Sequence, residues 1–336
     1  MNKLIFKLFY QNRAFVLFFM FASALLVGCG QKINGSVTGQ IPAEIAKNPE
    51  VYFCPKDDCG KVLEAHIKSA ASSVHCALYD INLENLISSL AKKSKTADVK
   101  LVMDESNYKK QVNGEGIKFD NSKQLMHNKF CVIDDGLVIT GSFNPTNNDN
   151  FRNNNNIIIA YSNALAKNYE DEFNELWSGE FGRGRNVEYP IIYINNIKIE
   201  NYFCPEDKCS SRIIDLIKNA KNSVYFMSFS FTNEDIADSL IKKNDLDIKG
   251  ILDSGQSSMK FSQLERMKGF GIKVKKDSNK YKMHHKVFII DEQTVVTGSF
   301  NPTLSADTKN DENLLIIHDE KIAKQYIKEF EELWQS

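Results

Sequence analysis

Apolar positions recur in the same order in the two halves of the chain, and this pattern predicts two similar α/β units. In the first half, helical spacing of apolar residues begins near Val62 and again near Leu83, and each stretch precedes a strand-like run. These runs cover 73–79 and 99–104. The second half has helical spacing over 213–217 and 236–241, and strand-like runs over 223–229 and 248–253. We therefore expect helices and strands to alternate in both halves.

Each half then continues with a hairpin, an apolar strand and a last helix. The last helix of each half places four large apolar residues on one face, at Tyr169, Phe173, Leu176 and Trp177 and at Tyr326, Phe330, Leu333 and Trp334. Residues with this spacing face a core, and the order of elements predicts layered α/β domains with mostly buried sheets. We expect the domains to cover 49–178 and 199–336, with a linker over 179–198.

Local identities between the halves indicate that the chain is an internal duplication. Residues 52–59 recur as 202–209, and three further segments recur at a second, common offset. These are 127–129 with 284–286, 141–146 with 298–303, and 172–177 with 329–334. Two copies indicate two similar domains rather than a solenoid, which needs at least three repeats.

The first 28 residues are typical of a targeting segment. Three basic residues precede an uninterrupted run of small and apolar residues over 14–28, which is shorter than the roughly 20 residues of a spanning helix. The run ends in Leu26-Val27-Gly28-Cys29, which resembles a lipoprotein lipobox and implies that Cys29 carries the lipid. An uncleaved anchor helix is the alternative. Both hypotheses predict an exported chain that is held at a membrane, with a tether over 29–48.

Composition narrows the classes of protein to consider. The chain has 42 Lys and Arg against 43 Asp and Glu, and 42% of its residues are hydrophobic, which excludes a disordered chain, a collagen and a multi-span membrane protein. Removal of residues 1–28 takes away three basic and no acidic residues, so the mature chain has 39 against 43 and a net charge of −4. A general nucleic-acid binder would carry a strongly basic surface, so the positive charge of any phosphate site must be local.

Six cysteines follow Cys29, and their spacing divides them into two groups. Outside the cytoplasm, two C-x4-C pairs predict local disulfides, Cys54 with Cys59 and Cys204 with Cys209. A zinc site is the alternative, although its usual spacing is tighter and no pair of histidines lies nearby. Cys76 and Cys131 lie in apolar strand-like runs, and we expect them to be small buried hydrophobic residues.

The hairpin of each half carries the candidate chemistry. Residues 129–134 are too apolar for a half-exposed strand and predict a buried central strand, and Asp135-Gly136 is a two-residue turn signal. With this turn, Lys129 lies opposite Ser142. Directly opposed residues have Cβ atoms about 4.5–5.5 Å apart, so the pair is expected to be in contact.

The same pairing of the two hairpin strands brings four residue types together at one strand end in each half. It places His127 opposite Asn144, Lys286 opposite Ser299, and His284 opposite Asn301. Burying a charged Lys beside a His in a core would cost free energy, but the same pair could bind an anionic ligand. We therefore expect an anion-binding patch in each half.

These residues resemble the paired HKD motifs of the phospholipase D superfamily. The two matches are His127-x-Lys129-x4-Asp134-x6-Gly141-Ser142-x-Asn144 and His284-x-Lys286-x4-Asp291-x6-Gly298-Ser299-x-Asn301. The short, similar copies look like the small endonuclease branch and the mitochondrial cardiolipin hydrolase/Zucchini branch of that family. The resemblance implies a bilobal α/β/α sandwich with pseudo-two-fold symmetry and one active site where the two hairpins meet. Because one chain contains both half-sites, it also implies a monomer.

The resemblance also implies phosphodiester cleavage through a covalent phosphohistidine, without a metal or another cofactor. Lys129, Lys286, Asn144 and Asn301 would hold the non-bridging oxygens and stabilise the transition state. Ser142, Ser299 and Asn155 are expected to contact the substrate, whereas Asp134 and Asp291 are expected to support the hairpins.

A difference between the copies suggests how the two histidines divide the work. In similar family members an acid downstream of the motif orients the histidine of the opposite lobe, and the matching positions here are Asn155 and Glu312. We hypothesise that His127 is the nucleophile with Glu312 as its partner, and that His284, which faces Asn155, is the general acid. The alternative is that 153–156 is simply a polar turn.

Three functions remain open from the sequence. The first is hydrolysis of phospholipid head groups at the membrane that holds the chain, where tethering raises the effective substrate concentration. The second is a membrane-tethered nuclease acting on DNA or RNA. It is supported by a local run of basic residues that could bind phosphates: Lys273, Lys275, Lys276, Lys280, Lys282 and Lys286. The third is a binding protein on an inactive scaffold, although both motifs are complete.

Overall fold

The strands of the first half form one mixed sheet. The computed structural model describes residues 41–108, 112 and 114–336, so the targeting segment, Cys29 and most of the expected tether lie outside the described residues. The strand order in this sheet is β2-β8-β7-β6-β3-β4-β5. Its strands are β2 (Glu50–Cys54), β3 (Ser73–Leu78), β4 (Asp98–Asp104), β5 (Ile117–Asp120), β6 (Lys129–Ile133), β7 (Leu137–Gly141) and β8 (Asn155–Tyr161).

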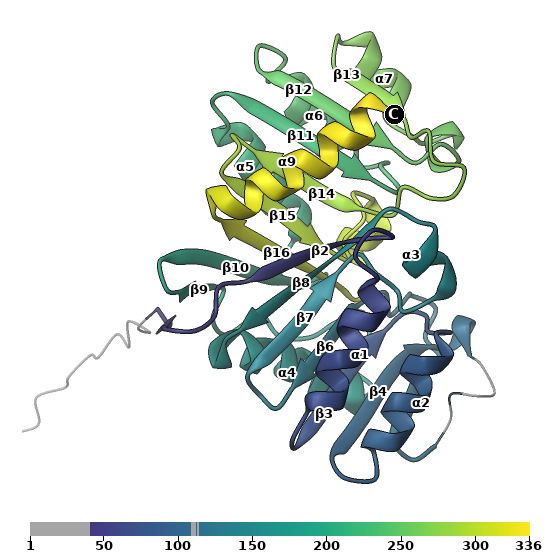
Figure 1. The fold of residues 1–336 in the computed structure, drawn as a ribbon. Coiled ribbons are helices and arrows are strands. Elements are labelled where there is room, and N and C mark those ends of the chain that lie inside the picture. Colours follow the sequence, from purple (N-terminus) through teal and green to yellow (C-terminus); the bar gives the residue numbers. More distant parts are fainter. Residues whose placement is uncertain (1–40, 109–111, 113) are drawn as a thin grey trace, which may run out of the picture. The chain divides into compact units, whose positions relative to one another are not determined.

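The strands of the second half repeat this order and extend it at one edge. The order is β1-β9-β10-β16-β15-β14-β11-β12-β13 (Figure 1). The strands are β1 (Ala43–Glu44), β9 (Ile191–Ile194), β10 (Ile197–Cys204), β11 (Ser223–Ser228), β12 (Asp247–Leu252), β13 (Lys273–Lys276), β14 (Lys286–Ile290), β15 (Thr294–Gly298) and β16 (Glu312–His318). The duplication seen in the sequence is therefore also a duplication of topology.

Ordered structure extends into both segments that were expected to connect domains. β1 lies in the expected tether and pairs in parallel with β9, which lies in the expected linker. Contacts group residues 41–336 into one unit rather than into two separate domains. The edge of the second sheet is built from β1 and β9, which precede the first and the second repeat. The domain boundaries at 49–178 and 199–336 stay predictions.

Helices cover the sheets in corresponding places. They are α1 (Cys59–Ser69), α2 (Glu84–Lys93), α3 (Asn147–Phe151), α4 (Asn163–Ser178), α5 (Cys209–Asn219), α6 (Glu234–Ile241), α7 (Leu264–Gly269), α8 (Leu304–Thr308) and α9 (Glu320–Gln335), with 3₁₀ turns η1 (Glu105–Asn107) and η2 (Gln256–Ser258). In the first half α1 and α2 pack on one face of the sheet and α4 on the other. The layered α/β architecture expected from the sequence is confirmed.

The last helix of each half packs as its apolar face predicted. Ser162 and Asp319 cap α4 and α9 by accepting a backbone N–H three residues ahead. The stripes that include Tyr169 and Tyr326 are buried except at Trp177, Leu333 and Trp334, which are partly buried. Each stripe also contacts the other half of the chain, because Tyr169 meets Phe203 edge-on with ring centroids 5.0 Å apart and Tyr326 meets Phe53 at 4.9 Å. One hydrophobic core thus joins both halves.

The register of the hairpins differs from the sequence prediction by one residue. Ile133 pairs with Leu137 and Phe130 with Thr140, so three residues, not two, form the turn. Asp134 and Asp135 both adopt left-handed backbone conformations, with φ of 52° and 51°, which Asp tolerates better than most residues. The second hairpin has the same three-residue turn, with Ile290 opposite Thr294. The predicted direct opposition of Lys129 to Ser142, His127 to Asn144, Lys286 to Ser299 and His284 to Asn301 was therefore wrong.

The predicted disulfides are confirmed, and a third one corrects the sequence prediction. Cys54 is bonded to Cys59 and Cys204 to Cys209. Cys76 and Cys131 are also bonded to each other, rather than being free buried hydrophobic residues. They lie directly opposite each other on the neighbouring antiparallel strands β3 and β6, with Cα atoms 4.1 Å apart. Such a pair is within bonding reach, but only the strand pairing reveals it.

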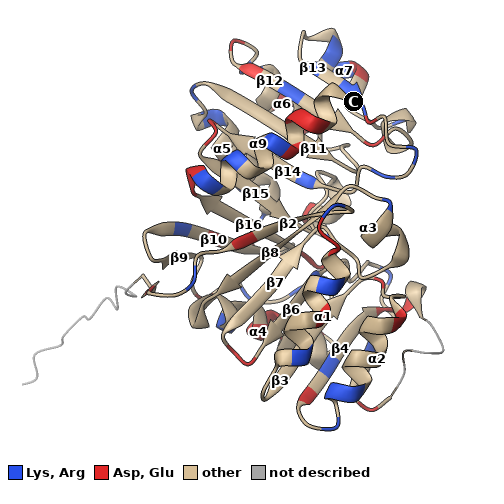
Figure 2. Ribbon diagram, in the orientation of Figure 1, with Lys and Arg blue, Asp and Glu red and all other residues tan. Residues whose placement is uncertain are grey.

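The helices carry mixed charges on their surfaces, and their length and hydropathy bear on membrane insertion. Basic and acidic residues are interspersed on α1, α5 and α9 rather than gathered into one stripe (Figure 2). Among the residues that the structure describes, no helix is both long enough and apolar enough to cross a membrane.

Candidate active site

The two halves exchange backbone contacts at the start of each HKD strand. His127 lies two residues before β6, and its N–H donates to the carbonyl of Asp311 at 2.9 Å. His284 precedes β14 in the same way and donates to the carbonyl of Asn154 at 2.9 Å. Asp311 and Asn154 immediately precede β16 and β8. This exchange brings the first side chain of each of these strands to the histidine of the other half.

Glu312 reaches His127 by this route. Both carboxylate oxygens lie 2.9 Å from Nδ1 of His127, and both side chains are buried. A carboxylate only accepts, so Nδ1 carries the proton and Nε2 is left with its lone pair. The pairing expected from the sequence is present, although its catalytic role stays a prediction.

Asn155 reaches His284 by the equivalent route. Its Oδ1 lies 2.8 Å from Nδ1 of His284. A carboxylate that the sequence analysis missed also approaches the same nitrogen, because Oδ2 of Asp149 lies 3.3 Å away. Asp149 belongs to α3, which directly follows the first HKD hairpin.

Two aromatic side chains pack against the rings of the histidines. Tyr79 meets His127 edge-on, with ring centroids 4.8 Å apart, and Phe229 meets His284 in the same way at 5.1 Å. These residues follow the equivalent strands β3 and β11. With Nδ1 anchored and the ring edge packed, each imidazole has a defined orientation.

The two motif lysines are buried beside the histidines. Nζ of Lys129 donates to the carbonyl of His127 at 2.7 Å, and Nζ of Lys286 donates to the carbonyl of His284 at 2.6 Å. Burial lowers the pKa of Lys129 to about 8. Burial, with Lys129 nearby, lowers the pKa of Lys286 well below its ordinary value. Because burial disfavours both ammonium charges, an anion bound beside them would be favoured.

The motif asparagines and serines have different surroundings. Asn144 donates through its backbone N–H and its Nδ2 to Asp149, at 2.8 and 2.9 Å. Ser142 and Ser299, for which we expected substrate contact, are fully buried, and their hydroxyls accept the backbone N–H of Asn156 and Asn313 at 3.1 and 2.9 Å. The hydroxyls thus support the next strand behind the site.

The motif aspartates support the hairpins, as expected. Asp134 accepts three backbone N–H groups from residues 71–73, and Asp291 does the same for 221–223. Burial raises the pKa of Asp134, but these donors outweigh it and lower the pKa to about 2. Each aspartate therefore fastens the hairpin turn to the loop that enters the central strand.

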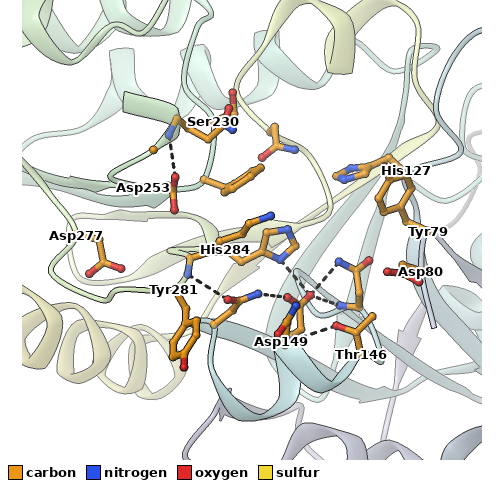
Figure 3. A pocket seen from close by; sticks show the side chains of 18 of the residues that line it. Tyr79, Asp80, His127, Thr146, Asp149, Ser230, Asp253, Asp277, Tyr281 and His284 are labelled. Carbon is orange, nitrogen blue, oxygen red and sulfur yellow. Dashed lines mark hydrogen bonds and ion pairs between the residues drawn. The ribbon is translucent and has the colours of Figure 1, made fainter. Parts of the chain in front are cut away.

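A cleft of about 1270 Å³ contains both histidines (Figure 3). Five of the predicted site residues line it, namely His127, Asn144, His284, Asn301 and Glu312, and so does Asp149. Its wall also includes charged and aromatic residues that the motif does not specify, among them Asp80, Arg152, Asp253, Asp277, Lys280, Tyr281 and Lys282. The structure thus unites the two predicted patches in one site.

Burial governs the protonation of both histidines in the cleft. It lowers the pKa of His127, although Glu312 opposes this, and it lowers the pKa of His284 to about 3 against the opposing effect of Asp149. Both imidazoles are therefore neutral at pH 7 before a ligand binds. In the described part of the chain, no group of three or more His, Cys, Asp or Glu is arranged to hold a metal ion.

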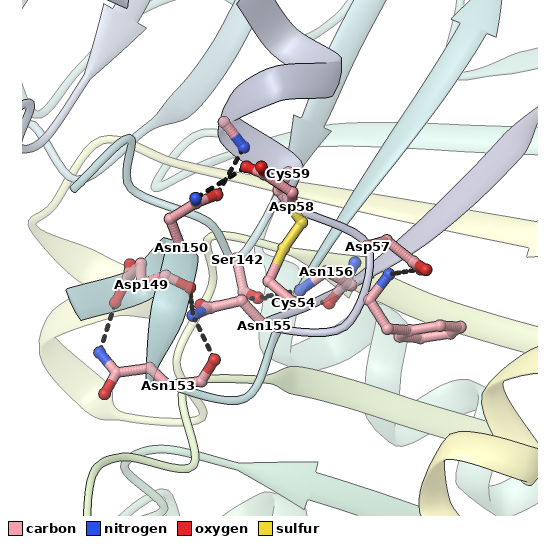
Figure 4. Close-up of a disulfide and its surroundings, with 12 residues drawn as sticks. Cys54, Asp57, Asp58, Cys59, Ser142, Asp149, Asn150, Asn153, Asn155 and Asn156 are labelled. Carbon is pink, nitrogen blue, oxygen red and sulfur yellow. Dashed lines mark hydrogen bonds between the residues drawn. A yellow bond between two sulfur atoms is a disulfide. The ribbon is translucent and has the colours of Figure 1, made fainter. Parts of the chain in front are cut away.

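The C-x4-C disulfides lie directly behind the site. Cys54 is the register partner of Asn155, and Cys204 is the partner of Glu312. Figure 4 shows that the Cys54–Cys59 turn also anchors α3, because Asn150 accepts the N–H of Gly60 at 2.6 Å and donates to Asp58 at 2.8 Å. The disulfide thus braces the elements that carry Asp149 and Asn155.

Comparisons with known proteins identify the same family in both halves. The family described as cardiolipin synthase, PLD-like domain matches residues 63–177 and 213–334, one match for each half. A phospholipase D from Rickettsia bellii is 33% identical over 142 residues, which cover 42% of this chain and 71% of the relative. A mitochondrial cardiolipin hydrolase from Xenopus laevis is 34% identical over 137 residues, which cover 39% of this chain and 65% of the relative.

A solved structure extends the similarity in fold to both halves. Phosphatidylserine synthase from Haemophilus influenzae superposes with a TM-score of 0.63 over 85% of this chain and 86% of that one, at 11% identity. The fold is therefore a tandem arrangement of two α/β repeats. Both repeats match the family, and the chain therefore belongs to the phospholipase D superfamily and is a phosphodiesterase of that kind.

Proposed function

We propose that this protein hydrolyses phosphodiesters without a metal ion, through a covalent phosphohistidine, and that its substrates are phospholipid head groups. One observation carries the proposal. His127 and His284, from opposite halves, line one cleft, and each has its Nδ1 anchored by an acceptor. Each Nε2 is then the nitrogen available to a substrate, which suits one histidine to attack phosphorus and the other to transfer a proton.

The reaction takes two displacements. In the first, the Nε2 lone pair of neutral His127 attacks phosphorus, the bond to the leaving oxygen breaks, and protonated His284 gives its proton to that oxygen. In the second, His284 takes a proton from water, the water oxygen attacks phosphorus, and the P–N bond breaks. Glu312 stabilises the positive charge on His127 while the phosphoryl group is attached, because its carboxylate contacts the same ring.

The charges of the substrate and the site complement each other. An entering phosphodiester anion raises the pKa values of Lys129, Lys286 and His284, which burial lowers. The anion thereby recruits the proton that His284 must donate. Asn144 and Asn301 both line the cleft, and an amide group donates to phosphate oxygens through its Nδ2. We assign both lysines and both asparagines to the phosphate oxygens.

The cleft mouth supports the choice of lipid. Leu125 and Tyr281 line the cleft and are partly exposed, and Phe151 and Leu304 are exposed on the short helices that line it, α3 and α8. Apolar side chains beside basic ones suit the boundary between head groups and acyl chains. In this proposal a lipid on Cys29 holds the exported, monomeric protein at the membrane that contains its substrate.

A nucleic acid strand is the second candidate substrate. Arg152, Lys280 and Lys282 line the cleft, and the ring of Tyr281 contacts the cationic groups of Arg152 and Lys280. Cationic groups around one aromatic ring are typical of sites that hold a strand by its phosphates and stack a base. The acidic residues Asp80, Asp253 and Asp277 on the same cleft count against a long polyanion.

The deciding experiment measures which phosphodiester the purified protein cleaves in EDTA. Vesicles of cardiolipin and of phosphatidylcholine, single-stranded DNA and RNA are offered separately, and products are identified by mass. We expect lipid head-group release that EDTA leaves unchanged. Cleavage of nucleic acid alone would end the lipid proposal, and loss of all activity in EDTA would contradict the metal-free mechanism.

Two variants and a control tie this activity to the site. His127→Ala and His284→Ala should each abolish turnover, whereas His66→Ala should not, because His66 is half-buried on α1 and contacts Tyr161 rather than the cleft. Substrate labelled with radioactive phosphorus should leave label on wild-type protein after rapid acid quenching, and His127→Ala should leave none. Label trapped on His284 in His127→Ala would reverse the assignment of the nucleophile.

A further inference from the structure

The two halves supply their carboxylates to the site from different positions. Glu312 begins β16, and its counterpart at the start of β8 is Asn155, which carries no charge. Asp149 lies in α3, and its counterpart in α8 is Ala306, which has no polar group. The first half therefore has a carboxylate at the helix position only, and the second half has one at the strand position only. The two differences together leave the site with one carboxylate for each histidine.

The contacts of Asp149 hold it in place for this role. Its Oδ2 accepts both the N–H and the Nδ2 of Asn144 and lies 3.3 Å from Nδ1 of His284, while its Oδ1 accepts Nδ2 of Asn153 at 2.6 Å. The carboxylate is buried, and its helix begins at a cap in which Thr146 accepts the N–H of Asp149. Figure 3 shows Asp149 reaching toward His284 from the opposite side of the cleft to Ser230 and Asp253.

We infer that Asp149 is the positioning carboxylate of His284, and that it does from helix α3 what Glu312 does for His127 from strand β16. The inference rests on the proposed function, because the role matters only if His284 exchanges a proton with substrate. It explains how the first repeat keeps an anion beside the histidine although its strand position is the neutral Asn155. It also links Asn144 to His284, since one oxygen atom of Asp149 contacts both.

The charges around His284 make the role specific. Burial lowers the pKa of His284, Lys286 from β14 and Lys129 from β6 lower it further, and Asp149 opposes them by raising it. Asn155 fixes the ring but supplies no charge. Loss of the negative charge of Asp149 should therefore leave the ring oriented and make it harder to protonate.

The test moves the carboxylate of the first repeat from position 149 in α3 to position 155 in β8. We compare wild type, Asp149→Asn, Asp149→Ala and the double variant Asp149→Ala/Asn155→Glu, which gives the first repeat the arrangement of the second. With an alkyl phosphodiester, Asp149→Asn should lower kcat about 10- to 100-fold, and the alkaline limb of kcat should move to lower pH. The double variant should recover most of the kcat that Asp149→Ala loses and return the limb toward its wild-type position.

A matched control comes from the other half of the chain. Asp307 lies in α8, accepts the N–H of Ser210 at 2.7 Å and contacts no histidine in the described structure. Asp307→Asn should leave the pH profile of kcat unchanged. Melting temperatures of all variants separate misfolding from a change in protonation. A wild-type pH profile in Asp149→Asn, or a double variant no more active than Asp149→Ala, would overturn the inference.

A second readout does not depend on turnover. The imidazoles are labelled with ¹⁵N and observed by NMR with dimethyl phosphate added, and His284 is assigned from His284→Ala. Asp149→Asn should lower the pKa of His284 and move its Nδ1 proton resonance, and the double variant should reverse both changes. If wild type cleaves no phosphodiester but these shifts occur, the contact is right and the proposed function is wrong. Unchanged resonances contradict the inference whatever the activity.

Discussion

Glu312 contacts Nδ1 of His127 with both carboxylate oxygens, each at 2.9 Å, although 185 positions separate the two residues. The contact exists because the backbone of His127 is hydrogen-bonded to Asp311, the residue before Glu312. His284 is tied to Asn154 in the same way, but the next side chain there is neutral. The site is therefore symmetric in its backbone and asymmetric in its charges.

Glu312→Gln should keep the ring of His127 in place and remove the charge that stabilises its cation. We expect kcat to fall by at least about 10²-fold with little change in KM, because the charge is needed mainly after attack has begun. Steady-state kinetics on an alkyl phosphodiester would measure this. An effect confined to KM would mean that Glu312 serves binding rather than the chemical step.

The division of roles between the histidines predicts a dependence on the leaving group. His284→Ala should lose most activity on an alkyl phosphodiester but much less on bis(p-nitrophenyl) phosphate, whose leaving group departs without a proton. His127→Ala should lose both activities, since the nucleophile is needed in each case. Rate ratios of the two variants on the two substrates would measure this, and the opposite pattern would exchange the roles.

Ligand binding should take up protons. Burial lowers the pKa of Lys129 to about 8 and of His284 to about 3, and a bound anion raises both, so affinity for dimethyl phosphate should weaken as pH rises through about 8. Calorimetric titrations at one pH in buffers of different ionisation enthalpy would count the protons. Zero uptake between pH 7 and 9 would mean that the lysines are already charged in the empty cleft.

Asp134 should contribute to stability through its charge. Its pKa is lowered from 3.8 to about 2 in the folded protein, so its contribution is complete above about pH 4 and is lost as pH falls toward 2. Because the side chain is exposed and screened by solvent, we expect Asp134→Asn to cost only about 1 kcal/mol at pH 7. Urea unfolding at pH 7 and 3 would test this. Asp135→Asn, also at a left-handed position, is the matched control.

The Cys76–Cys131 disulfide should stabilise the first sheet more than the Cys54–Cys59 disulfide does. The two bonds close segments with sequence separations of 55 and 5, and loop entropy increases with length. Replacing Cys76 and Cys131 with Ala should cost about 4 kcal/mol, against about 2 kcal/mol for the shorter pair. Unfolding of each double variant by urea would compare them. Equal losses would indicate that strain or packing outweighs loop entropy.

Local patterns were sufficient to predict much of this protein. The strand order of the two sheets repeats because the sequence repeats, and the apolar face of the last helix is buried, as its spacing indicated. The HKD motifs and their resemblance to a known family led from single residues to the pairs His127 with Glu312 and His284 with Asn155. Such features depend on periodicity and on motif spacing, which are properties of the chain itself.

Contacts between segments distant in sequence were decided by the tertiary structure. Two left-handed residues, Asp134 and Asp135, lengthen the turn and shift the hairpin register, and only the pairing of β3 with β6 brings Cys76 to Cys131. Asp149 was missed for the same reason, because no motif marks it. Its role becomes visible only where α3 meets the histidine of the other half, since helix packing and strand pairing determine which distant side chains meet.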